Sequence, residues 1–180
     1  MAVVTHSHFL IRLLKQREHA VGCEVGVHTG DTASKVLSAL PGIEVYHAVD
    51  PWESYEKYDG SKYRKPGNKI YKSWKSAKEA FISRTSSFKK TVIHQMTSVE
   101  AVKRIKDESL DWIFIDANHE YEYIKENLEL WEPKVKKGGL ISGHDYENKK
   151  WSGIKKAVDE FIPKEKLNVA KEFLVWWYIK

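Results

Sequence analysis

The sequence predicts an α/β protein with a mostly parallel sheet and helices on both of its faces. Strand-like and helix-like patterns alternate along the chain, from Cys23–Val27 to a helix near Gly153–Phe161. Parallel strands need long crossover connections, which are usually helical and right-handed. The tail from Leu167 to Ile179 instead indicates two short strands with no helix between them, so at least one of them must run antiparallel.

Each element is predicted from its apolar period, which is 3.6 residues for a helix and two residues, or a continuous run, for a strand. In chain order the predicted elements are an N-terminal helix within residues 1–20, a strand at Cys23–Val27, a helix from Asp31 to about Leu40, a strand at Ile43–Val49, a helix through Phe81, a strand at Thr91–Met96, a helix at Ser98–Lys106, a strand at Leu110–Ile115, a helix at Tyr121–Trp131, a strand at Leu140–Ser142 and a helix near Gly153–Phe161. Thr97 and Glu100 have the spacing of a capping box.

The composition is that of one globular domain, predicted to span residues 1–180. The longest apolar stretches are only as long as strands, so no membrane-spanning helix is expected. A single cysteine excludes an intramolecular disulfide framework, and the N-terminus lacks a signal-peptide pattern, so we expect a cytoplasmic protein. The formal net charge is +5, but most basic residues are interspersed with acidic ones, as on an ordinary solvated surface.

Polar or small residues follow each of the five predicted parallel strands. In open α/β sheets, ligands bind outside the carboxyl ends of the strands, where the strand order reverses. In chain order these residues are Gly26 and Gly30, Asp50, Met96-Thr97-Ser98, Asp116, and His144-Asp145. Their shared position predicts one ligand site at this edge of the sheet.

The turn after the first strand indicates a nucleotide-type cofactor. Gly26 and Gly30 permit a tight strand-to-helix turn and a close approach of the backbone to a ligand. Asp50 follows Gly30 by roughly twenty residues, where an acid accepts hydrogen bonds from ribose hydroxyls. Trp52 is expected either against the adenine or in the core.

NAD is the competing cofactor. Its fingerprint, Gly-x-Gly-x-x-Gly, lets the backbone approach a pyrophosphate. The turn here reads Gly-Val-His-Thr-Gly and lacks the middle glycine. Glu24 precedes Gly26 by two residues, and a carboxylate there repels a pyrophosphate but suits a cation. The turn therefore favours a sulfonium cofactor.

Four motifs resemble those of class I S-adenosylmethionine-dependent methyltransferases. They are Glu-x-Gly-x-x-x-Gly at Glu24–Gly30, Val-Asp-Pro-Trp at Val49–Trp52, Ile-Asp-x-x-His-x-Tyr at Ile115–Tyr121, and Gly-Gly-x-x-x-x-His-Asp-Tyr at Gly138–Tyr146. The chain is most similar to a small-molecule branch that includes relatives of macrocin O-methyltransferase and cephalosporin hydroxylase. The resemblance implies a Rossmann-like, doubly wound, seven-stranded sheet whose final strand is antiparallel.

The resemblance also implies S-adenosylmethionine as cofactor and a small-molecule acceptor, sugar-like or natural-product-like, that is methylated on oxygen. The implied cofactor contacts are Glu24, Gly26 and Gly30 around the methionine part, Asp50 on the ribose, Met96, Thr97 and Ser98 beside the adenine, and Asp116 beside the sulfonium.

Four residues are expected to lie where the methyl group is transferred, after two of the predicted strands: Asp116, His119, His144 and Asp145. Methyl transfer to a hydroxyl is an in-line displacement that needs a base or a metal to remove the proton. Asp116, His144 and Asp145 predict a divalent-metal site. The expected ion is Mg²⁺, or Mn²⁺ or Zn²⁺ because a histidine stands where relatives carry an acid or amide. Alternatively, His119 or His144 is a general base. In a third reading His119 caps the helix near Glu120 and His144 holds a loop.

Residues 51–68 form a predicted lid-like insertion, since this connection is longer than most. Its tyrosines and basic residues suit an anionic, sugar-like or aromatic acceptor; they are Tyr55, Lys57, Tyr58, Lys62, Tyr63, Arg64 and Lys65. Single-stranded nucleic acid would also suit them, but no RNA-binding module accompanies the domain. The open alternatives are a nucleic-acid methyltransferase, an NAD-dependent sugar-modifying enzyme and a catalytically silent binding protein. The apolar N-terminal helix and the Trp-rich tail are expected either to form a homodimer interface or to belong to the core.

Overall fold

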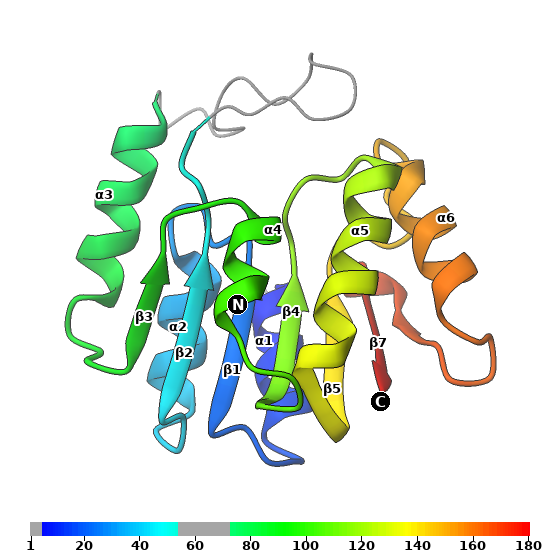
Figure 1. Ribbon diagram of the computed structural model, residues 1–180, viewed down its shortest axis with the longest axis horizontal. Coiled ribbons are helices and arrows are strands. Elements are labelled where there is room, and N and C mark those ends of the chain that lie inside the picture. The colour runs from blue at the N-terminus through cyan, green and yellow to red at the C-terminus, as the bar shows by residue number, and fades with distance from the viewer. Residues whose placement is uncertain (1–4, 54–72) are drawn as a thin grey trace.

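The computed structural model describes residues 5–53 and 73–180, which contain one seven-stranded sheet (Figure 1). The strands are β1 Val21–Val25, β2 Val45–Val49, β3 Thr91–His94, β4 Leu110–Ile115, β5 Val135–Gly143, β6 Asn168–Ala170 and β7 Val175–Ile179. Their order across the sheet is β3-β2-β1-β4-β5-β7-β6. The first five strands pair in parallel, and β7 runs antiparallel to both of its neighbours. The predicted sheet with a final antiparallel strand is confirmed.

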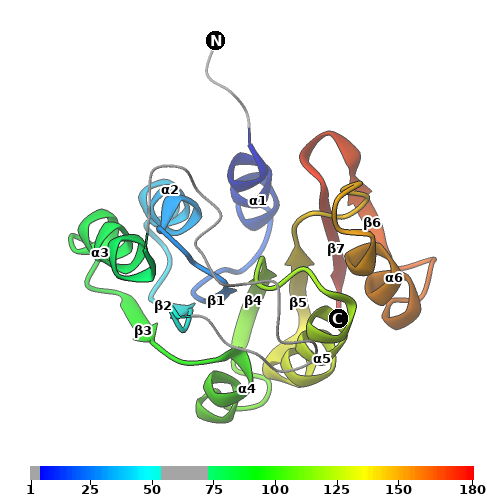
Figure 2. The same cartoon turned by 90° about the horizontal axis from the view of Figure 1, so that it is seen from above.

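Helices cover both faces of the sheet, as seen from above in Figure 2. The six α-helices are α1 His6–Leu14, α2 Asp31–Ala39, α3 Trp74–Thr85, α4 Ser98–Ala101, α5 Tyr121–Trp131 and α6 Ser152–Phe161. One core cluster joins the first three helices to one face, and a second cluster joins the last three to the other. Both clusters hold fully buried large side chains, such as Phe81 in the first and Trp131 in the second. Right-handed crossovers put helices on one face while the strand order runs from β1 to β3, and on the other face once it continues from β4 to β5.

The structure corrects several predicted boundaries. The strand expected at Cys23–Val27 is Val21–Val25, because Gly26 has φ +94° and leaves the extended conformation. The predicted strand Thr91–Met96 ends at His94, and the predicted helix Ser98–Lys106 is one α-turn followed by the 3₁₀ turn Val102–Arg104.

The strand predicted at Leu140–Ser142 is the longest of the sheet, Val135–Gly143. The glycine pair Gly138-Gly139, a residue pair typical of turns, lies inside this strand. Gly138 has φ +81°, and the register with β4 shifts between Leu110 and Trp112, so the glycines form an irregularity within a continuous strand.

The two segments that suggested a homodimer are largely part of the core. Leu10 and Leu14 of α1 are completely buried, as is Val175 of β7, and Trp176 is 1% exposed. Of the two expectations for these segments, the core placement is seen, and the homodimer stays a prediction. Within the described ranges no helix is both long and apolar enough to cross a membrane. Of the lid-like insertion predicted at 51–68, only residues 51–53 fall in the described part of the chain; Tyr55, Lys57, Tyr58, Lys62, Tyr63, Arg64 and Lys65 lie outside it.

Candidate active site at the carboxyl edge of the sheet

The strand order reverses between β1 and β4, which pair in parallel and end together at Val25 and Ile115. The chain leaves β1 toward β2 on one side, whereas β4 leads to β5 on the other. The two connections diverge, which leaves a crevice at this edge of an open α/β sheet. The predicted site residues follow these strands.

Gly26 allows the turn after β1 to lie against the chain that leaves β4. A Cβ atom at this position would lie 2.2 Å from the carbonyl oxygen of Asp116. Gly30 also has a positive φ, +76°, and a Cβ there would lie 2.8 Å from the ring of Phe81. Close packing within the protein therefore requires both glycines of the first motif, Gly26 against the backbone of Asp116 and Gly30 against Phe81.

Asp50, at the end of β2, joins two loops. Its carboxylate accepts hydrogen bonds from the backbone N–H groups of His28 at 2.9 Å and Trp52 at 2.8 Å. Burial raises the pKa of Asp50 to about 6 against the opposing effect of these two bonds. The carboxylate thereby fixes the two loops that flank the predicted ribose position, and each oxygen retains capacity for a further donor.

Trp52 lies in the core. Its side chain is buried, its indole N–H donates to the carbonyl of His28 at 2.7 Å, and its ring contacts Phe81. Of the two placements that the sequence left open, the structure shows the core placement.

A hollow lies over the ends of β1 and β2. Its lining residues are Val25, Gly26, Val49, Asp50, Pro51, Glu53, Trp74, Ser98 and Ala117. Three predicted cofactor contacts, Gly26, Asp50 and Ser98, thus meet at one cavity. Trp74, at the start of α3, was not predicted, because no spacing rule connects it to the strand ends.

Met96 and Thr97 are not among the residues that line this hollow. Met96 packs against the core, and Thr97 is the N-cap of α4. The predicted capping box is confirmed: Thr97 accepts from the Glu100 N–H, and the Glu100 carboxylate accepts from the Thr97 N–H at 3.0 Å. Ser98, the first residue of α4, connects this helix to α5. Its hydroxyl donates to the Asn127 side-chain oxygen and accepts from the Trp131 indole N–H at 2.7 Å.

Glu24 is buried within β1, and its carboxylate accepts a hydrogen bond from the Tyr46 hydroxyl on β2. Burial raises the pKa of Glu24 to about 8, and the neighbouring carboxylates of Asp116 and Asp50 add to this rise. The glutamate is therefore largely protonated at neutral pH until a cation comes near it. Its contact with the methionine part of a cofactor stays a prediction.

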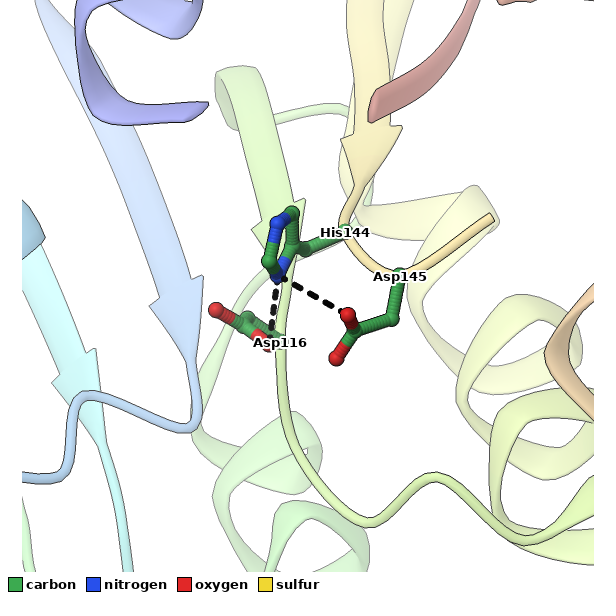
Figure 3. Close-up of side chains that lie close together, drawn as sticks. All are labelled: Asp116, His144 and Asp145. Carbon is green, nitrogen blue, oxygen red and sulfur yellow. Dashed lines mark ion pairs between the residues drawn. The ribbon is translucent and has the colours of Figure 1, made fainter. Parts of the chain in front are cut away.

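Asp116, His119, His144 and Asp145 form a group that we call the acid–histidine cluster. Figure 3 shows three of them converging from the ends of β4 and β5. The Nδ1 atom of His144 lies 3.6 Å from a carboxylate oxygen of Asp116 and 3.6 Å from one of Asp145. His119 Nε2 lies 2.7 Å from Asp145 and 3.7 Å from Asp116.

The cluster is electrostatically coupled. Burial lowers the pKa of His119, but its hydrogen bonds and charge interactions with Asp116 and Asp145 outweigh this and raise the pKa to about 9. The pKa of His144 is also raised, since Asp116 outweighs its burial. The same pairs hold the pKa of the Asp116 carboxyl well below its usual range despite burial. Both aspartates are ionised at neutral pH, as metal ligands must be.

Three members of the cluster fit a divalent cation. Asp116, His144 and Asp145 each offer one ligand atom, and these atoms lie within 4.8 Å of one another. Two carboxylates with one imidazole suit Mn²⁺ or Zn²⁺ better than the all-oxygen surroundings typical of Mg²⁺. The three residues therefore match a divalent cation in the spacing, the burial and the chemistry of their ligand atoms.

Neither of the structural roles considered for the two histidines is among the contacts that the structure describes. The N-cap of α5 is Glu120, whose N–H donates to the Asn118 side chain at 3.0 Å, so the cap that the sequence suggested for His119 is wrong. The loop after β5 is held by Asp145 instead of His144: the Asn148 amide donates to Asp145 at 2.7 Å.

Comparison with known proteins agrees with this geometry. Residues 23–146 match a family described as a methyltransferase domain. Among solved structures, the calicheamicin methyltransferase CalS11 superimposes with a TM-score of 0.69 at 15% identity, over 96% of this chain and 76% of that one. The O-methyltransferase TomG of Streptomyces achromogenes, in complex with SAM, gives 0.66 at 14% identity, over 99% and 82%.

An O-methyltransferase of Bacillus cereus, in complex with SAH, gives a TM-score of 0.65 at 15% identity, over 100% of this chain and 83% of that one. No curated protein matches the sequence. At these identities the solved structures show the fold, whereas the family match spans most of the chain and includes every strand end of the candidate site. The chain belongs to this methyltransferase domain family.

Proposed function

We propose that this methyltransferase transfers the methyl group of S-adenosylmethionine to an oxygen atom of a small-molecule acceptor, with a divalent metal ion bound beside the acceptor. The observation that carries the proposal is the convergence of Asp116, His144 and Asp145 next to the hollow that Gly26, Asp50 and Ser98 line. Names of structural neighbours support the acceptor class: one is a TDP-rhamnose 3'-O-methyltransferase and another an O-methyltransferase of tomaymycin synthesis.

In this proposal the cofactor lies along the carboxyl edge of β1, β2 and β4. Asp50 accepts hydrogen bonds from the ribose while its two backbone partners keep it fixed. Glu24, below the turn, gains charge as the ammonium group of the methionine part approaches, since a nearby cation lowers the pKa of a carboxyl. The bound cofactor supplies an electrophilic methyl group. An acceptor oxygen would take this methyl group by in-line displacement, with the neutral thioether as the leaving group.

The acid–histidine cluster would activate the acceptor. Asp116, His144 and Asp145 would hold the metal, which lowers the pKa of a hydroxyl placed next to it. His119 is outside this ligand group, but its Nε2 lies 2.7 Å from a carboxylate oxygen of Asp145, and in this proposal it would receive the hydroxyl proton. A cation held by Asp116 and Asp145 would offset the negative charge that raises the pKa of His119, and would so increase the neutral form that can accept a proton.

Calorimetric titration tests the cofactor and the metal separately. We expect S-adenosylhomocysteine to bind and NADH not to bind, and we expect Mn²⁺ to bind the wild-type protein. Asp145→Asn should weaken Mn²⁺ binding at least tenfold because it removes one charged ligand. Asp107→Asn, a surface acid paired with Lys134, is the matched control and should leave it unchanged. Absence of S-adenosylhomocysteine binding at high micromolar concentration would contradict the cofactor assignment, and equal Mn²⁺ affinity of wild type and Asp145→Asn would contradict the metal site.

A further inference from the structure

His6 lies against the acid–histidine cluster although it is far from the motifs in sequence. It is the first residue of α1, and its ring centroid is 4.2 Å from that of His144, at an interplanar angle of 44°. The His6 ring also stacks on Phe114 of β4, with the two ring centroids 6.0 Å apart. Its Nε2 forms a hydrogen bond of 3.0 Å with the Thr32 hydroxyl. His6 is therefore fixed between three elements of the fold.

The contacts of His6 limit the freedom of His144. One ring nitrogen of His144, Nδ1, faces Asp116 and Asp145, and the ring itself contacts His6. Rotation of His144 about its side-chain bonds would have to displace the His6 ring. That ring is itself held by Thr32, a residue that is only 7% exposed in the first turn of α2. The contacts thus form a chain from α2 through α1 to a candidate metal ligand.

We propose that His6 is a positioning residue, which holds the His144 imidazole in the orientation that directs Nδ1 toward Asp116 and Asp145. This inference rests on the proposed function, because it concerns the same metal site. Residues that hold a metal ligand through a hydrogen bond usually contribute about 10- to 100-fold to metal affinity, and we expect the lower end of this range for the ring contact of His6. They do so because a ligand that is already oriented loses less conformational entropy when the metal binds. The N-terminal helix, which carries no recognised motif, thereby becomes part of the site.

Three variants separate the contacts of His6. His6→Ala removes the ring, and should weaken Mn²⁺ binding about tenfold. His6→Phe keeps a planar ring against His144 and should recover most of that loss. Thr32→Val keeps His6 but removes its hydrogen bond, and should have a smaller effect than His6→Ala. His8→Ala is the matched control, a histidine of the same helix whose ring is exposed and hydrogen-bonded to Thr5. It should bind Mn²⁺ like the wild type.

The experiment combines Mn²⁺ titration followed by electron paramagnetic resonance with NMR of the histidine rings in the metal-free protein. We expect His6→Ala to shift the ring resonances of His144, and His8→Ala to leave them in place. The inference is overturned if His6→Ala binds Mn²⁺ as tightly as the wild type, or if His6→Phe is as weak as His6→Ala. If the wild type itself binds no Mn²⁺, the proposed metal function fails. The NMR comparison then decides about His6 alone, since an unshifted His144 would overturn the positioning role.

Discussion

Glu24 shows how one residue serves both the stability of the fold and the candidate site. Its carboxyl is enclosed between β1 and β2, where its only hydrogen bond described by the structure comes from Tyr46. Because burial raises its pKa to about 8, from an ordinary value of 4.5, the group binds a proton more tightly in the folded than in the unfolded chain. A charge at this place is costly until a positive ligand offsets it.

The pKa of Glu24 predicts a pH dependence of stability. Between pH 4.5 and about 8 the folded state holds a proton that the unfolded state has released, so this contribution to stability falls as the pH rises and is constant above that window. Glu24→Gln keeps a hydrogen-bond acceptor for Tyr46 but cannot ionise. Relative to wild type, the variant should gain stability from pH 5 to pH 8, by at most about 1.4 kcal/mol per pH unit.

Urea unfolding at pH 5, 6.5 and 8 measures this difference. Glu44→Gln, which removes an exposed carboxylate next to β2, is the control and should run parallel to the wild type. Parallel curves for Glu24→Gln and wild type would show that Glu24 does not titrate in this window.

The site residues differ in how far they could be predicted from the sequence. Asp50 and Asp116 were predictable because each directly follows a strand. Trp74 and His6 were not, because each belongs to a helix that reaches the site from elsewhere in the fold.

The contact between the turn after β1 and the end of β4 determines where the two halves of the site meet. Gly26 permits this contact, since its φ of +94° and the carbonyl of Asp116 leave no space for a side chain. Gly138 has a similar φ of +81°, but a Cβ there would have no atom within 4 Å. The two glycines thus differ in their surroundings while sharing an unusual backbone conformation.

Gly26→Ala should consequently destabilise the protein much more than Gly138→Ala. Both substitutions carry the cost of a left-handed residue, about 1 kcal/mol. Gly26→Ala must also push the turn after β1 away from the Asp116 carbonyl, so its total loss should exceed about 3 kcal/mol. Chemical denaturation of the two variants measures the difference directly. An equal loss of unfolding free energy in the two variants would contradict a stabilising contact between the turn and the end of β4.

At the element scale, the long amphipathic and buried segments were predictable. The strand Leu110–Ile115 and the helix Tyr121–Trp131 have the predicted bounds, because an unbroken apolar run and a helical stripe each admit one interpretation. The extension of β5 through Gly138-Gly139 was not predictable. Glycines usually end a strand, and the partner strand that accommodates them lies elsewhere in the chain.

The candidate cofactor site is formed by residues that are far apart in the sequence and that come together only in the folded protein. A ligand that binds the folded state alone raises the free energy of unfolding, by about 2.7 kcal/mol at a concentration of 100 times its Kd. For a chain of this size, about 1 kcal/mol corresponds to 2–4 °C in Tm. S-adenosylhomocysteine at that concentration should therefore raise the Tm by roughly 5–10 °C.

Thermal unfolding followed by circular dichroism checks this shift. NADH at the same concentration should leave the Tm unchanged. Asp50→Asn should reduce the shift caused by S-adenosylhomocysteine, whatever its own Tm, because it replaces the charged acceptor predicted to bind the ribose. A larger shift with NADH than with S-adenosylhomocysteine would favour the dinucleotide interpretation instead.

The sequence by itself determined the α/β class, the antiparallel ending of the sheet and the strand-end positions of Gly26, Asp50, Asp116 and the His144-Asp145 pair. These properties follow from local periodicity and from the rule that parallel strands end at one edge. Only the tertiary structure decided which strand ends share a cavity, that Trp52 lies in the core, and that His6 from the first helix contacts His144. Such contacts depend on strand order and helix packing, which join residues that no sequence spacing connects.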